Sequence, residues 1–251
     1  MWLAIICAVL SWWLSTGVIV YLNLQGAHSR YLSFAAATFI AGLALWAAHW
    51  TAADSSIMAT YLGFACGLAL WGWQIMSYFM GYITGPVKAP LRQGSSPGSR
   101  FAQGLGTSLH HELVILALAA ALAIVSWGQA NPTALYTYLI LWSMHTSAKL
   151  NMFLGVRNLY LEFLPARLSY LRSYLRRRRG NWLLPLSLLL GLLGTTALIQ
   201  MAMQAAPSSA AMVQASLLAT LLGLATLEHV MLVIPLRVSA LWDWSVPAAE
   251  T

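Results

Sequence analysis

The sequence predicts an all-α protein that crosses a membrane several times, and three observations support this fold class. Hydrophobic residues make up 60% of the 251 residues and charged residues only 8%, whereas about 25% of the residues in soluble domains are charged. The apolar residues occur in long runs, and a run of about 20 is enough to cross a bilayer as a helix. The basic residues gather in alternate connections between these runs. This composition excludes a soluble fold.

Seven runs have the length of a membrane-spanning helix. They cover residues 2–24, 31–50, 56–83, 109–127, 132–153, 182–203 and 212–236. The third run is the longest, and a helix of that length tilts or projects from the bilayer. The first run lacks a basic n-region and a small-residue cleavage site, which favours a retained span over a signal peptide. We therefore expect a single seven-helix membrane domain over residues 1–251.

The basic residues predict the orientation of these spans. Of the 13 Lys and Arg residues, all except Lys149 lie in the first, third and fifth connections or after the last span. Cytoplasmic loops of membrane proteins are enriched in Lys and Arg. The C-terminus and these three connections are therefore expected in the cytoplasm, and the N-terminus in the periplasm.

Two of the cytoplasmic connections differ in character. Residues 85–108 are rich in Gly, Pro and Ser, and we expect an irregular loop. Residues 157–179 contain leucines at spacings of three and four and end in arginines, which predicts a basic amphipathic helix on the membrane surface.

This predicted surface helix is a candidate docking site for lipid or for an acidic partner, because each arginine near an anionic leaflet contributes about 1 kcal/mol. Its arginines are Arg167, Arg172, Arg176, Arg177, Arg178 and Arg179. The basic stretch is short and lies against the bilayer, so we do not expect it to bind nucleic acid.

Ionisable side chains lie inside three of the apolar runs. They are His111, Glu112, His145, Lys149, Glu228 and His229. Such groups are costly in a membrane and usually mark a pathway, a ligand site or a structural pair. With a rise of about 1.5 Å per residue and the predicted orientation, all six fall in the cytoplasmic half of the bilayer. His145 and Lys149 are four residues apart and share one helix face, so the sequence predicts one polar layer between the fourth, fifth and seventh spans.

Three interpretations of this layer stay open. In the first, Lys149 pairs with Glu228 or Glu112 and locks the helices together, and the histidines donate hydrogen bonds. In the second, a neutral imidazole coordinates the central metal of a tetrapyrrole or orients another pigment. In the third, the His and Glu side chains hold a catalytic metal that activates water, although no HExxH or comparable spacing occurs.

Several motifs lie in and around the same spans. SAKLNMFLGV covers residues 147–156 and EFLP follows at 162–165, while TGP, HEL and LEH occupy 84–86, 111–113 and 227–229, with Pro235 and Trp242 beyond. In this order, from about Trp12 to Trp244, the chain resembles the PuhE family, which is associated with photosynthetic complex assembly in purple phototrophic bacteria.

The resemblance implies an integral protein of the bacterial inner, photosynthetic (intracytoplasmic) membrane that assists assembly of the reaction centre and the light-harvesting 1 complex. The family is associated with bacteriochlorophyll supply, and no catalytic reaction is assigned to it, so an enzyme is the less favoured class. The matching positions are Glu112, Lys149, Asn151, Glu228 and His229.

These observations lead to the hypothesis that the protein transiently binds or presents a bacteriochlorophyll-type pigment or an antenna subunit. Lys149 and Glu228 are the expected charge pair, and His111 or His229 the expected ligand. The expected partners are the bilayer, reaction-centre and core-antenna subunits, and other assembly factors. The full candidate pocket is His111, Glu112, His145, Lys149, Asn151, Glu228 and His229.

Two alternatives belong to other classes of protein. One is an intramembrane metal-dependent enzyme that acts on a lipid or a pigment precursor. The other is a structural accessory subunit of the mature complex.

Overall fold

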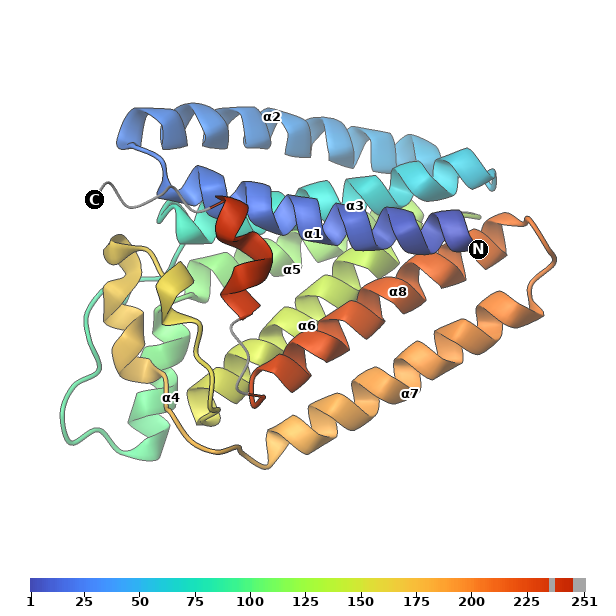
Figure 1. Cartoon of the computed structure of the whole chain (residues 1–251). Coiled ribbons are helices and arrows are strands. Elements are labelled where there is room, and N and C mark those ends of the chain that lie inside the picture. Colours follow the sequence, from blue (N-terminus) through green and yellow to red (C-terminus); the bar gives the residue numbers. More distant parts are fainter. Residues whose placement is uncertain (235–237, 246–251) are drawn as a thin grey trace.

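The protein is a bundle of long α-helices, as a computed structural model that describes residues 1–234 and 238–245 shows (Figure 1). The long helices are α1 (Trp2–Leu24), α2 (Ala27–Ala52), α3 (Ile57–Phe79), α5 (Leu109–Ser126), α6 (Thr133–Leu154), α7 (Leu183–Gln204) and α8 (Ala210–Met231). A short helix, α4 (Pro97–Gly106), and three 3-10 helices, η1 (Leu161–Phe163), η2 (Ala166–Tyr174) and η3 (Val238–Ser245), lie between or after them. The described residues form no strand beyond one isolated bridge, so the all-α class is confirmed.

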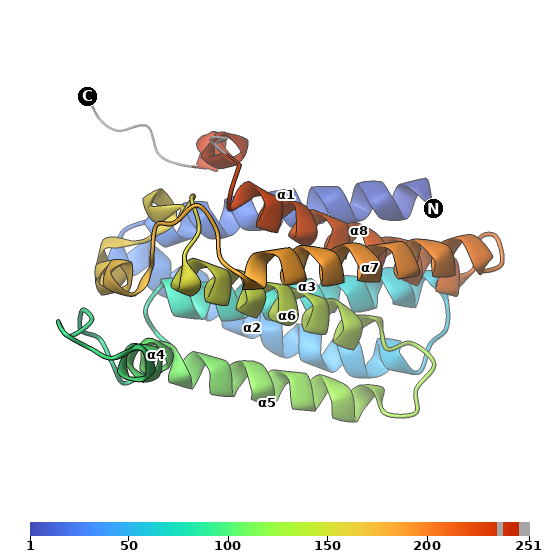
Figure 2. The same ribbon diagram turned by 90° about the horizontal axis from the view of Figure 1, so that it is seen from below.

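The long helices coincide with the seven apolar runs of the sequence. Within the described residues, five of them are long and apolar enough to cross a membrane, namely α1, α2, α5, α7 and α8. The chain is therefore a multi-pass membrane protein. Of the other two, α3 contacts α1, α2, α5, α6 and α8, and α6 lies between α5 and the pair α7 and α8 (Figure 2). The last predicted span runs to 236, and residues 235 and 236 lie outside the described part of the chain.

The connections between the long helices lie at the two ends of the bundle. At one end, the guanidinium of Arg167 donates to the carbonyl oxygens of Phe79 (2.7 Å) and Asn23 (3.0 Å), which brings the connections after α1, α3 and α6 together. At the other end, the amide of Asn131 donates to the Thr51 carbonyl at 3.0 Å. The first end carries the predicted basic connections, and we call it the basic end.

The third run gives a shorter helix than the sequence predicts. Ser56 begins α3 by accepting a hydrogen bond from the Ala59 N–H, which is a common way to satisfy a free N–H in the first turn. The helix ends at Phe79, because Gly81 takes a positive φ of 83° and the N–H of Tyr82 folds back onto the Ser77 carbonyl at 2.9 Å.

Two predictions for the connections are wrong. The segment 85–108 is not irregular throughout, because Ser96 caps α4 and Pro97 stands at its start, a position that proline favours. The segment 157–179 does not form an amphipathic α-helix but the 3-10 helices η1 and η2, with Tyr160 at a positive φ of 47°. Its polar groups bond to distant parts of the chain, and these tertiary contacts override the local leucine spacing.

Gly67 fixes the close approach of α3 to α6 and gives a test of the packing. A Cβ at this position would lie 2.7 Å from both the Ala134 carbonyl oxygen and the Thr137 Cβ. Gly67→Ala is expected to lower the free energy of unfolding by about 1–3 kcal/mol, as overpacked cores do. Gly42→Ala is the matched control, since nothing lies within 4 Å of a Cβ there; alanine should stabilise α2 by up to about 1 kcal/mol. Thermal unfolding followed by tryptophan fluorescence measures both, and equal effects would contradict this account of the packing.

Candidate functional site

Lys149 forms an ion pair with Glu112, which links α6 to α5. Its ammonium also donates to the Ser108 hydroxyl at 2.9 Å. The two charged side chains are 33% and 21% exposed, so the pair lies at the rim of the bundle. The first interpretation of the polar layer is therefore correct for Glu112, whereas the expected pair between Lys149 and Glu228 is wrong. Depth along the helices allowed either partner, but Lys149 projects towards α5 and not towards α8.

His229 belongs to a chain of hydrogen bonds that joins α8, α6 and α7. Its Nδ1 lies 2.9 Å from the Ala225 carbonyl and its Nε2 lies 3.0 Å from the Ser147 hydroxyl. A carbonyl only accepts, so Nδ1 carries a proton and donates to Ala225. Ser147 is 2.8 Å from the Ser187 hydroxyl, to which the Asn151 amide donates at 3.1 Å. Both nitrogens of His229 are thus hydrogen-bonded within the protein, which disfavours the predicted role of His229 as a ligand.

His111 is buried between aromatic rings. It is 1% exposed, and its ring centroid lies 4.7 Å from that of Tyr78 and 6.4 Å from that of His145. Within the described residues, neither of its nitrogens has a hydrogen-bond partner. The ring does not line the cavity described next, so His111 is not in the position of a ligand for a molecule bound there.

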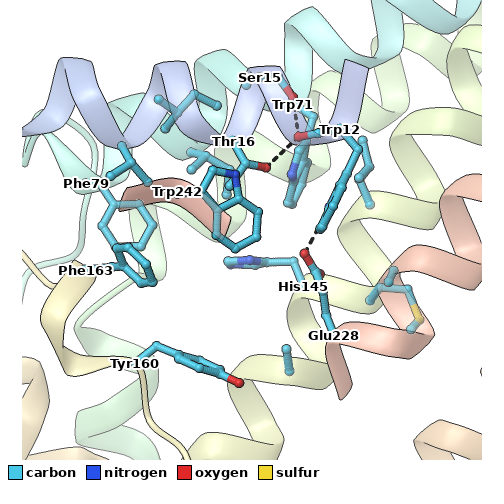
Figure 3. A pocket seen from close by; sticks show the side chains of 18 of the residues that line it. Trp12, Ser15, Thr16, Trp71, Phe79, His145, Tyr160, Phe163, Glu228 and Trp242 are labelled. Carbon is cyan, nitrogen blue, oxygen red and sulfur yellow. Dashed lines mark hydrogen bonds between the residues drawn. The ribbon is translucent and has the colours of Figure 1, made fainter. Parts of the chain in front are cut away.

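A cavity of about 580 Å³ lies between α1, α3, α6 and α8, on the side of the bundle that η3 covers (Figure 3). His145 and Glu228 face it from α6 and α8, among aromatic side chains. The indole N–H of Trp12 donates to Glu228 Oε1 at 3.0 Å. The other labelled lining residues are Ser15, Thr16, Trp71, Phe79, Tyr160, Phe163 and Trp242.

The imidazole in the wall of the cavity is that of His145. Its ring meets Trp71 edge-on, with the centroids 5.4 Å apart, and no hydrogen bond joins it to another described side chain or carbonyl. The hydroxyls of Ser15 and Thr16 both donate to the Trp12 carbonyl and are already satisfied. The imidazole and the carboxyl that the lining presents to a bound molecule are those of His145 and Glu228.

Tryptophans of α1 hold the 3-10 helix η3 against the cavity. The indole of Trp13 donates to the Leu241 carbonyl at 2.9 Å, and the indole of Trp242 donates to the Trp13 carbonyl at 3.1 Å. Trp12 and Trp242 also meet edge-on at 5.4 Å. No local pattern in the sequence indicates that residues more than 200 positions apart in the chain close one cavity.

The proposed metal ligands are divided between these places. Glu112 pairs with Lys149, His229 bonds within the helix network, and Glu228 bonds to Trp12. In the part of the chain that the structure describes, no three His, Cys, Asp or Glu side chains gather closely enough to hold a metal ion. The arrangement does not supply the three-ligand set that a catalytic zinc site uses.

The predicted docking arginines also divide into two groups. Arg167 is half-buried and ties η2 to the ends of α1 and α3 through its bonds to Asn23 and Phe79. Burial, and then the positive charge of Arg30, lower the pKa of Arg167. The remaining ones, Arg172, Arg176, Arg177, Arg178 and Arg179, are exposed at the basic end.

Arg100 is a structural residue that the sequence gave no reason to single out. It is buried, its guanidinium donates to the Phe153 and Tyr174 carbonyls, and its Cζ lies 3.7 Å from the centre of the Phe153 ring. It thereby satisfies a free carbonyl at the C-terminal end of α6.

Comparison with known proteins gives two matches over the whole chain. A family model described as "Protein of unknown function (DUF3623)" matches residues 1–251. A protein of Rhodobacter capsulatus described as "Uncharacterized 30.4 kDa protein in puhA 5'region" is 31% identical over 255 residues, which cover 99% of this chain and 92% of the relative. No solved structure matches the chain.

Proposed function

Because the chain belongs to the DUF3623 family, with a relative described by its place in the puhA 5′ region of Rhodobacter capsulatus, we propose that it is an integral membrane assembly factor for the photosynthetic reaction centre and light-harvesting 1 complex. The motif resemblance to the PuhE family supports the same role. The proposed location is the photosynthetic inner membrane. All seven long helices would span it, with the basic end in the cytoplasm, as the positive-inside rule requires.

The cavity beside His145 is the observation that carries the molecular part of the proposal. Ligand cavities in proteins measure about 300–1,000 Å³ and combine apolar walls with a few polar groups; this one, at about 580 Å³, has that size and character. We propose that it receives the ring of a bacteriochlorophyll-type pigment as cargo. An imidazole nitrogen is a suitable axial ligand for the metal of a tetrapyrrole, and His145 presents one.

Each wall of the cavity would have its own part in holding the cargo. The indoles of Trp71 and Trp242 offer flat apolar faces, and Glu228, held by Trp12, offers a polar contact to a ring substituent. The imidazole of His145 faces the cavity without a hydrogen bond to another described residue, which suits a protein that binds cargo better than a purely structural subunit. This favours the assembly factor over an accessory subunit of the mature complex.

The test is the absorption spectrum of the protein purified from a pigment-producing host. Wild type is expected to carry bacteriochlorophyll absorption bands, and His145→Ala is expected to lose them because the axial nitrogen is removed. His110→Ala is the matched control, since His110 is exposed at the start of α5, away from the cavity, and this variant should keep the bands.

Two outcomes would contradict the proposal. Wild type without pigment would exclude direct pigment binding. Pigment retained in His145→Ala and lost in His111→Ala would move the ligand to the buried histidine, which does not line this cavity.

A further inference from the structure

Four consecutive arginines lie at the basic end, and backbone hydrogen bonds hold the first three of them in place. Residues 176–178 pair with Val156, whose N–H donates to the Arg176 carbonyl at 3.1 Å and whose carbonyl accepts from the Arg178 N–H at 2.9 Å. The Arg176 N–H donates to the Met152 carbonyl at 3.2 Å. The run is therefore attached to the C-terminal end of α6 and is not a loose tail.

Gly155 makes room for this arrangement. Its φ is +128°, and a Cβ there would lie 2.8 Å from Cδ of Arg178, so the stem of Arg178 crosses directly over the glycine. A preformed group of charges binds a ligand at a lower entropic cost than a flexible one.

The described side chains do not compensate the positive charge of this run. Arg176, Arg177, Arg178 and Arg179 are all exposed, and among the described side chains none has a carboxylate within ion-pair distance. Their charges also act on buried Arg100, whose pKa is lowered by burial and then by Arg176 and Arg178. Arg100 is committed to the Phe153 and Tyr174 carbonyls, and Nε of Arg177 donates to the Arg157 carbonyl at 3.2 Å. The exposed guanidinium groups of Arg176, Arg178 and Arg179 are therefore the main ones available to an external anion.

The run lies where a membrane helix begins. Asn181 donates to the Asn151 and Gly155 carbonyls and accepts from the N–H of Leu183, so it fixes the start of α7 beside the arginines. Trp182 is 73% exposed, as tryptophans at a membrane interface are. Exposed leucines continue along α7, namely Leu186, Leu189, Leu190, Leu192 and Leu193.

We propose that Arg176–Arg179 and Trp182 form a binding site for the headgroup of an anionic phospholipid, with its acyl chains along the exposed leucine face of α7. Arginine binds phosphate oxygens through two parallel hydrogen bonds. An acidic protein would satisfy the charges but would leave the adjoining apolar face of α7 without a matching partner. The lipid satisfies both, and for this reason it is the favoured occupant.

The test measures which lipid stays with the purified full-length protein. Delipidated protein in a neutral detergent is mixed with equal amounts of phosphatidylglycerol and phosphatidylcholine that have the same acyl chains, and native mass spectrometry counts the retained lipids. Wild type is expected to retain phosphatidylglycerol preferentially. Arg178→Gln/Arg179→Gln should lower this preference by roughly 30-fold, because each arginine near anionic lipid contributes about a fivefold factor, and added salt should weaken it.

Lys88→Gln/Arg92→Gln is the matched control, since it removes the same charge from two exposed residues of the basic end. It should retain the wild-type preference. The proposal fails if Arg178→Gln/Arg179→Gln binds phosphatidylglycerol as wild type does, or if the control loses as much. It also fails if the arginine run retains a polyglutamate peptide in place of the lipid. None of these results depends on pigment binding at His145.

Discussion

Replacing Lys149 with methionine is expected to lower the free energy of unfolding by about 2–3 kcal/mol. Breaking a fully buried ion pair from one side costs about 3–5 kcal/mol, because the remaining charge is left without a partner. The pair with Glu112 is 33% and 21% exposed, which reduces that cost. Thermal or SDS-induced unfolding in detergent, followed by tryptophan fluorescence, measures the change.

A double-mutant cycle identifies the partner of Lys149. Removing the uncompensated carboxylate in Lys149→Met/Glu112→Leu should restore most of the lost stability, since an apolar pair of similar volume is often as stable as the ion pair. Lys149→Met/Glu228→Gln should restore none, because Glu228 bonds to Trp12. Additive effects of the Lys149 and Glu112 substitutions would show that the two side chains do not interact.

Replacing Asn151 with leucine is expected to be at least as damaging, with a loss of about 2–4 kcal/mol in the free energy of unfolding. The Asn151 side chain is fully buried and donates to the Ser147 carbonyl at 2.9 Å and to the Ser187 hydroxyl at 3.1 Å. Its loss leaves buried polar groups without a partner, at about 1–3 kcal/mol for each group, and weakens the link between α6 and α7. The same unfolding assay measures the effect.

The matched control for this network is Ser143→Ala. Ser143 is an exposed serine of α6 whose hydroxyl bonds only to the Ile140 carbonyl of its own helix, and the change should be within about 0.5 kcal/mol. Ser147→Ala and His229→Leu, by contrast, should be non-additive, because their side chains share one hydrogen bond. Equal losses for the Asn151 and Ser143 variants would contradict a structural role for the network.

The helices of this protein could be predicted because their cause is local. A run of about 20 apolar residues has one stable conformation in a bilayer, a helix that satisfies its own backbone, and all seven predicted runs contain one in the structure. The basic residues gather at one end because they occur in alternate connections, and alternate connections of consecutive helices lie at the same end of the bundle. The shared face of His145 and Lys149 follows from the helical period, and both side chains do lie near the first turn of α5.

The connections were harder to predict because their conformation depends on distant partners. The leucine spacing in 157–179 indicates an α-helix, yet Arg167 bonds to the ends of α1 and α3. Val156 pairs with the arginine run in the same way. Such bonds join residues far apart in the chain, so they cannot be predicted from the sequence pattern around either residue.

The candidate site shows the same division. The sequence by itself determined the membrane class, the helices, and the positions of the costly polar residues along them, since all three follow from hydrophobicity and the helical period. Only the tertiary structure decided which of those residues meet. It paired Lys149 with Glu112, placed His229 in a hydrogen-bond network and left His145 facing a cavity. The reason is that the rotation of each helix about its axis is set by packing against its neighbours.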